Sequence, residues 1–133
     1  MKLNRMTCIF ALVATLVAGS VTFAATKPAT SSHFQGAKAN TGSVTFSNEN
    51  GKRLLRVSSD FQVPDTPAPT WRVVDSKGNV YTLDAFKIKG LIGNAEKREV
   101  LLPAYVRDVV KVQVYCAWAE VLLGEASFSS PVS

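Results

Sequence analysis

Hydrophobic and polar residues alternate most regularly in residues 109–128, which read VVKVQVYCAWAEVLLGEASF. The apolar positions of its first half are Val110, Val112, Val114, Cys116 and Trp118. A period of two with β-branched residues on one face is typical of a half-buried strand. The pattern therefore predicts that Cys116 and Trp118 both point into the core, and that removing the Trp118 side chain costs about 3–5 kcal/mol.

Short apolar runs separated by turn residues continue along the rest of the chain. The other predicted strands are Ser43–Ser47, Leu54–Phe61, Trp71–Asp75, Val80–Phe86, Glu99–Leu102 and Val121–Leu123. The predicted irregular segments are turns at Asn50-Gly51, at Ser76–Asn79 and near Ala119 and Glu120, a loop over residues 87–98 and a helical turn over residues 104–108. No long segment has a helical period. The sequence therefore predicts an all-β fold, a single-domain antiparallel β-sandwich or small barrel.

The N-terminal segment has the pattern of a secretory signal peptide. A basic start is followed by an apolar run over Ile9–Val17, and small residues at Thr22 and Ala24 favour cleavage after Ala24. The expected boundaries are 1–24 for the signal peptide, 25–32 for a flexible leader and 33–133 for a single β domain. We therefore expect an exported protein, periplasmic or secreted, with no membrane span after cleavage. An uncleaved membrane anchor is the alternative.

Charge adds little to this picture. The formal net charge is +5, and the signal peptide carries two of the basic residues. A loose basic cluster at Lys87, Lys89, Lys97 and Arg98 has no interleaved aromatic residues of the kind that bind nucleic acids. We interpret it as a solvated loop. We expect a monomer that does not bind nucleic acid.

The cysteine and histidine content limits the chemistry. The chain has two cysteines and one histidine. Cys8 leaves with the signal peptide, so Cys116 is alone in an exported protein and has no intramolecular disulfide partner. His33 lies in the expected flexible N-terminal region. A zinc site of the Cys/His type cannot be assembled from one mature chain, and no C-x-x-C-H motif for covalent haem is present.

No catalytic constellation is found in the sequence. There is no G-x-S-x-G motif, and Gly90 and Gly93 lack the Lys-Ser/Thr that follows a phosphate-binding loop. Asp75 and Asp84 flank a predicted hairpin and are interpreted as turn and surface residues. The chain is therefore at most a redox or electron-transfer protein rather than a hydrolase or a nucleotide-dependent enzyme.

Two interpretations of Cys116 stay open. Burial among valines raises the pKa of a thiol, which would leave Cys116 as inert core packing. A redox thiol or a cofactor ligand must instead be reached from outside. The small residues Ala117, Ala119 and Gly124 could leave a gap near the sulfur, whereas Lys111 lies on the opposite face of the strand and cannot contact it.

A series of short motifs resembles the DM13 domain, a small extracellular module, over about residues 33–128. The motifs are Phe34-Gln35-Gly36, Thr41-Gly42-Ser43-Val44, Ala68–Val73, Lys89–Asn94, Leu102-Pro103 and Val112–Cys116, followed by Val121, Leu123, Gly124 and Ala126. The last group matches most closely the family's V-x-I-W-C and F-x-V-x-F-G-x-A. The sequence departs from the family at Ala68, Thr70, Ala119 and Leu123, where the family has Gly, Asp, Phe and Phe.

The resemblance implies a β-sandwich with a redox or electron-transfer role. In the family, the cysteine that matches Cys116 is proposed to act as a bare thiol or as the ligand of a prosthetic group such as haem. Cys116 is thus the one candidate redox and cofactor-binding residue, with an unidentified redox partner. The alternative is a non-catalytic extracellular binding or interaction module in which Cys116 is core packing and the partner is a surface ligand.

Overall fold

The computed structural model describes residues 18–20, 27–89 and 94–133. The strands are β1 (Ala29–Thr30), β2 (Val44–Glu49), β3 (Lys52–Val57), β4 (Pro69–Val74), β5 (Val80–Ala85), β6 (Lys87–Lys89), β7 (Asn94–Glu96), β8 (Glu99–Leu101), β9 (Val109–Cys116) and β10 (Val121–Val132). Within these ranges the chain forms strands and turns but no helix, and thus no helix that could cross a membrane. The predicted all-β class is confirmed.

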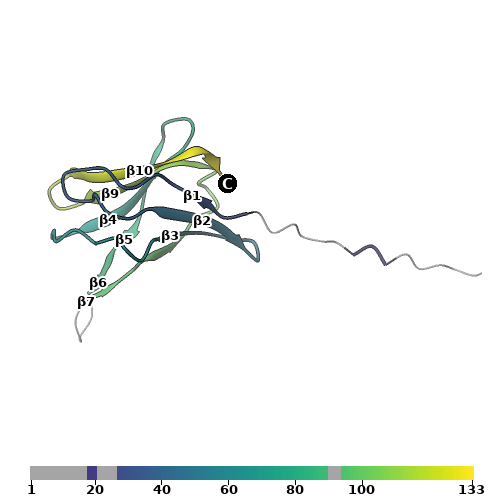
Figure 1. Ribbon diagram of the computed structural model, residues 1–133, viewed down its shortest axis with the longest axis horizontal. Coiled ribbons are helices and arrows are strands. Elements are labelled where there is room, and N and C mark those ends of the chain that lie inside the picture. Colours follow the sequence, from purple (N-terminus) through teal and green to yellow (C-terminus); the bar gives the residue numbers. More distant parts are fainter. Residues whose placement is uncertain (1–17, 21–26, 90–93) are drawn as a thin grey trace, which may run out of the picture.

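Two four-stranded sheets form the body of the protein (Figure 1). Their strand orders are β1-β2-β3-β8 and β10-β9-β4-β5, and every pairing is antiparallel. Both sheets are open, so the fold is a β-sandwich and the predicted alternative of a small barrel is wrong. Strands β6 and β7 pair as a separate hairpin that extends away from the two sheets (Figure 1).

The period of two predicted for β9 is confirmed from Val112 to Cys116, but it is wrong at the start of the strand, where Val109 is buried and Val110 is only partly covered. Val112, Val114 and Cys116 are buried, whereas Gln113 and Tyr115 between them are only partly covered. The buried residues lie on the face that packs against the other sheet, because the core contains side chains from both sheets. Strand β9 is central in its sheet, with β4 on one side and β10 on the other.

Four aromatic rings form a continuous line through the core. The ring centroids of Phe34 and Phe61 are 5.0 Å apart, and those of Phe61 and Phe86 are 5.5 Å apart. Phe86 stacks on Trp71 at 4.3 Å. The Trp71 Nε1–H donates a hydrogen bond to the carbonyl oxygen of Lys97 at 3.0 Å, which satisfies the only polar atom of this buried side chain.

Part of the expected flexible leader is ordered. Strand β1 is the edge strand of its sheet and pairs with β2, and the Ser31 N–H donates to the Val44 carbonyl at 2.8 Å. The next residue, Ser32, donates instead to the Ser127 carbonyl of β10 at 2.8 Å. The leader therefore connects the two sheets, because it satisfies edge groups of both. Residues 25–26 and most of the predicted signal peptide lie outside the described residues.

One predicted turn is confirmed, and two other predicted segments differ in the structure. Asn50 and Gly51 have the positive φ expected of this turn, 52° and 79°. The predicted loop over residues 87–98 instead contains β6 and β7. The predicted helical turn at residues 104–108 is a simple turn, closed by a hydrogen bond from the Val106 N–H to the Pro103 carbonyl at 3.1 Å.

Candidate functional site

Cys116 is the last residue of β9, at one end of the sandwich. It is a free cysteine and only 2% exposed. Its side chain points into the core, as the alternation predicts. The chain then turns over Ala117–Glu120 and returns as β10, so the sulfur lies directly beneath a turn.

A backbone hydrogen bond reaches the Cys116 sulfur from the turn that follows β9. The Ala119 N–H donates to Sγ at 3.5 Å, and this bond is the main reason that the pKa of the thiol is lowered from its ordinary value. Burial acts in the opposite direction, and the backbone N–H groups of Ala68 and Trp118 lower the pKa further. The expectation that burial makes the thiol inert therefore omitted the larger effect, which is hydrogen bonding to the thiolate.

Thr66 adds a side-chain hydroxyl to this site. Its Oγ1 is buried and has no hydrogen-bond partner within the described part of the chain. The hydroxyl also contributes to the lowered pKa of Cys116. A buried hydroxyl without a partner is costly, and a thiolate at Cys116 would give it an acceptor. Thr66 could not be identified from the sequence, because it lies far from Cys116 along the chain and no motif links the two residues.

The residues around Cys116 do not fit a haem group. A haem iron must reach an open Sγ, but this sulfur is 2% exposed and lies under the Ala117–Glu120 turn. Within the described ranges, no group of three or more His, Cys, Asp or Glu side chains could hold a metal ion. The bare thiol is the form of the site that this geometry supports.

Trp118 is on the surface, so its predicted place in the core is wrong. Its side chain is 77% exposed. The alternation stops because β9 ends at Cys116, and the positive φ of Glu120, 55°, completes the reversal of the chain. Val121 and Leu122 are also exposed, at 49% and 44%. We call Trp118, Val121 and Leu122 the hairpin tip, an apolar projection beside the buried thiol.

The first and last motifs of the resemblance contact each other. Gln35 and Glu125 exchange backbone hydrogen bonds at 2.9 Å in both directions. A Cβ on Gly36 would overlap the Leu123 carbonyl and the Gly124 backbone. These motif residues thus hold the N-terminal segment against β10, which is a structural role. The Lys89–Asn94 motif spans residues 90–93, which lie outside the description.

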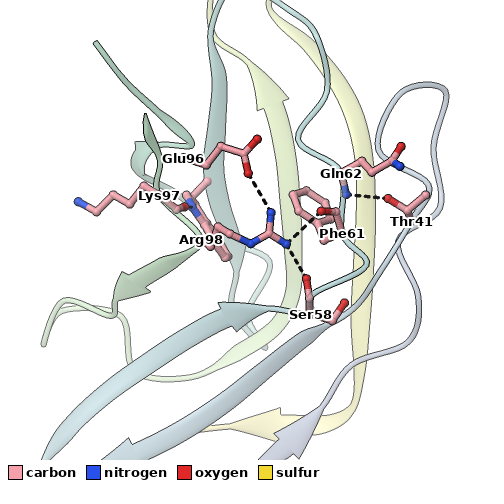
Figure 2. A network of polar contacts seen from close by, with 8 residues as sticks. Thr41, Ser58, Phe61, Gln62, Glu96, Lys97 and Arg98 are labelled. Carbon is pink, nitrogen blue, oxygen red and sulfur yellow. Dashed lines mark hydrogen bonds and ion pairs between the residues drawn. The ribbon is translucent and has the colours of Figure 1, made fainter. Parts of the chain in front are cut away.

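The basic cluster is not a solvated loop, because Arg98 is a structural residue (Figure 2). Its guanidinium donates to the Ser58 and Phe61 carbonyls at 2.6 and 3.0 Å and to the Glu96 carboxylate at 2.9 Å. These bonds fasten the end of the β6–β7 hairpin to the segment that follows β3. Lys97 forms an ion pair with Asp84 on the surface, as expected of Asp84.

Asp75 is a turn residue, as predicted, but it is buried at the centre of a hydrogen-bond network. Its carboxylate accepts bonds from the backbone N–H groups of Lys77 and Asn79, at 2.9 and 2.8 Å. The Asn79 amide and the Tyr81 hydroxyl donate at 2.9 and 3.0 Å. The Asn79 side chain contributes most to lowering the pKa of Asp75. These hydrogen bonds all lie within residues 75–81, so they hold the turn between β4 and β5 in place.

We expect Asp75→Asn to destabilise the protein at neutral pH by an amount that shrinks in acid. A lowered pKa in the folded state stabilises the protein above the unfolded-state pKa of about 4, and this stabilisation is lost as the pH falls through the folded-state pKa. Urea midpoints of both proteins between about pH 7 and pH 2 measure the difference. Asp65→Asn, at an exposed carboxylate, is the control. A difference that does not vary with pH would contradict this account.

Comparison of the chain with family models, with curated proteins and with solved structures finds no match.

Proposed function

We propose that this chain is an exported, DM13-like β-sandwich module with a redox function carried by the Cys116 thiolate. The observation that supports this most is the hydrogen bond from the Ala119 N–H to Sγ at 3.5 Å. It is reinforced by the buried Thr66 hydroxyl and lowers the pKa of the thiol. The thiolate is the reactive form of cysteine, so a site that stabilises it favours chemistry at sulfur.

The reaction that suits a single bare thiolate is two-electron oxidation by a small hydroperoxide. The sulfur attacks one peroxide oxygen, an S–O bond forms and the O–O bond breaks. The leaving hydroxide or alkoxide takes up a proton, so Cys116 becomes a sulfenic acid and the peroxide is reduced to water or an alcohol. An external thiol then forms a mixed disulfide with release of water, and a second external thiol restores Cys116 and leaves as a disulfide. The expected mature chain has no other cysteine, so both reducing thiols come from a partner.

Access to the sulfur requires motion of the turn above it. Cys116 is covered by Ala117–Glu120, whose side chains are exposed. Turns with few buried side chains open more readily than core strands. Opening here would expose Sγ without separating the sheets, and a small oxidant needs only a small opening.

We expect Cys116 to be labelled in the native state by methyl methanethiosulfonate, faster than the protein unfolds. Because the pKa is lowered, the labelling rate should reach half its maximum below the ordinary thiol pKa of about 8.5. Thr66→Val keeps the shape of the side chain but removes its hydroxyl, so it should shift the pH dependence of the labelling rate to higher pH. Thr82→Val, at an exposed position, is the matched control. Mass spectrometry after peroxide treatment should show one added oxygen, which Cys116→Ser abolishes.

The alternative function, an extracellular interaction module, draws support from the hairpin tip. Trp118, Val121 and Leu122 are exposed apolar residues close to one another in the chain at one end of the sandwich, and exposed apolar surface commonly marks interaction sites. The labelling experiment separates the two functions. If Cys116 reacts only at the rate of global unfolding, the redox proposal is contradicted, and Cys116 is core packing in a binding module.

A further inference from the structure

A cleft of about 430 Å³ lies at the edge of the other sheet. It is bounded by the end of the β2–β3 turn and by the segment that continues from the edge strand β8. The lining residues are Gly51, Lys52, Arg53, Leu101, Leu102, Pro103, Ala104 and Arg107. Three of these carry a positive charge and none carries a negative charge. The volume lies within the range of small-molecule sites.

Arg53 fixes one wall of the cleft. Its guanidinium donates hydrogen bonds to the carbonyl oxygens of Pro103 and Val106 at 2.9 and 2.8 Å, and to that of Arg107 at 3.3 Å. These bonds hold residues 103–107 in place. A carbonyl oxygen satisfies a donor but does not cancel its charge, so the positive charge of Arg53 remains in the cleft.

Lys52 and Arg107 add two further charges that no described carboxylate neutralises. Both side chains are exposed, and neither takes part in an ion pair within the described ranges. Other basic residues of the protein, such as Arg98 and Lys111, do pair with carboxylates. The cleft therefore concentrates uncompensated positive charge, which attracts anions.

The remaining lining is apolar. Leu101 in β8 is 53% exposed, and Leu102, Pro103 and Ala104 continue from it. An inorganic anion would leave this surface in contact with water. A ligand that carries an anionic group on a small apolar body would contact both parts of the cleft.

We propose that this cleft binds a phosphate monoester with a small apolar body. Arginine and lysine side chains bind phosphate through charge-assisted hydrogen bonds, and three positive charges match a dianion better than a monoanion. The group could belong to a free small molecule or to a lipid headgroup. The inference uses none of the residues around Cys116, so it stands or falls independently of the redox proposal.

Phenyl phosphate is the probe, titrated into the ¹⁵N-labelled protein at constant ionic strength. We expect saturable shifts of the backbone amide signals of residues 51–53, 101–102 and 104–107; residue 103 is a proline and has no amide hydrogen. Benzyl alcohol, which lacks the charge, and inorganic phosphate, which lacks the apolar body, should each bind more weakly. Shifts that do not saturate, or that follow basic residues over the whole surface, would overturn the proposal. If inorganic phosphate bound as tightly as phenyl phosphate, the proposal that the ligand has an apolar body would be overturned.

Charge-removing variants test the assignment to this cleft. Lys52→Gln combined with Arg107→Gln should weaken phenyl phosphate binding about tenfold or more, since two charged hydrogen-bond donors are lost. Lys38→Gln is the control, because Lys38 is also exposed but lies on the segment that packs against β10. Arg53 is left intact because it holds the wall of the cleft. Equal weakening by the control would contradict the assignment.

Vesicles separate the two sources of the phosphate group. Binding to phosphatidylcholine vesicles that contain phosphatidic acid, but not to phosphatidylcholine alone, would assign the cleft to a lipid headgroup. Binding of phenyl phosphate without binding to either vesicle would assign it to a free small molecule. In both cases the double variant must lose the binding. Retention of binding by that variant would overturn the proposal.

Discussion

Replacing Trp71 with alanine should lower the free energy of unfolding by about 3–5 kcal/mol. Trp71 is completely buried in β4, which pairs with both β5 and β9. Its ring stacks on Phe86, and its Nε1–H satisfies the Lys97 carbonyl. The variant loses this packing, leaves a cavity between the sheets and removes the donor from that carbonyl. A domain of this size is typically stable by only about 5–15 kcal/mol, so the loss is a large fraction of the total.

Trp118→Ala provides the matched control, because it deletes the same atoms from an exposed site. Trp118 is 77% exposed, so this variant should cost less than about 1 kcal/mol. Urea unfolding followed by circular dichroism measures both losses. Similar losses in the two variants would contradict the placement of the two tryptophans.

These two tryptophans show what the alternation of a sequence can predict. The pattern from Val112 to Cys116 correctly assigned the buried face of β9, because a strand that is half covered needs apolar residues at every second position. The same pattern wrongly continued to Trp118, because alternation does not show where a strand ends. The turn begins immediately after Cys116, and only the fold shows the reversal.

Long-range backbone pairing was the other feature that the sequence did not reveal. Strand β1 has only two residues, which is too short for an alternating pattern, and only its pairing with β2 defines it as a strand. Ser32 bonds to Ser127, which is far away along the chain. Polar residues such as these read as a flexible leader, since their composition alone does not show that two sheet edges lie nearby.

The candidate site was only partly predictable for the same reason. The lone Cys116 and its inward orientation follow from composition and from the period of two. The groups that lower the pKa of its thiol, the Ala119 amide and the Thr66 hydroxyl, come from a turn and a loop that meet only in the fold. The lining of the cleft beside β8 likewise comes from two distant segments, around residues 52 and 104.

Gly36 and Gly124, which both belong to the motifs of the resemblance, lie where two backbone segments are in close contact. The Gly36 backbone lies against the Leu123 carbonyl and Gly124, and Gly124 in turn lies against Ala39. The Leu123 carbonyl accepts hydrogen bonds from the N–H groups of Lys38 and Ala39, at 3.1 and 3.0 Å. The N-terminal segment can therefore approach β10 this closely only because positions 36 and 124 carry no Cβ.

Gly124→Ala should lower the free energy of unfolding by about 3 kcal/mol or more, from overpacking and from weakened hydrogen bonds. The new Cβ would overlap the Ala39 carbonyl oxygen and would lie 2.9 Å from the Ala39 Cβ. The backbone of residues 38–39 must then move away, which weakens the bonds to the Leu123 carbonyl. Urea unfolding of the variant measures the loss.

Two further variants separate this steric effect from other causes. Gly51→Ala adds a Cβ that meets no atom within 4 Å, at a φ of +79°, so it should cost only the 1–2 kcal/mol or so of a left-handed backbone conformation. Adding Ala39→Gly to Gly124→Ala removes one of the two overlapping atoms but leaves the carbonyl oxygen, so it should restore little stability. Full recovery in the double variant would show that the side chain of Ala39, rather than the backbone, sets the distance between the N-terminal segment and β10.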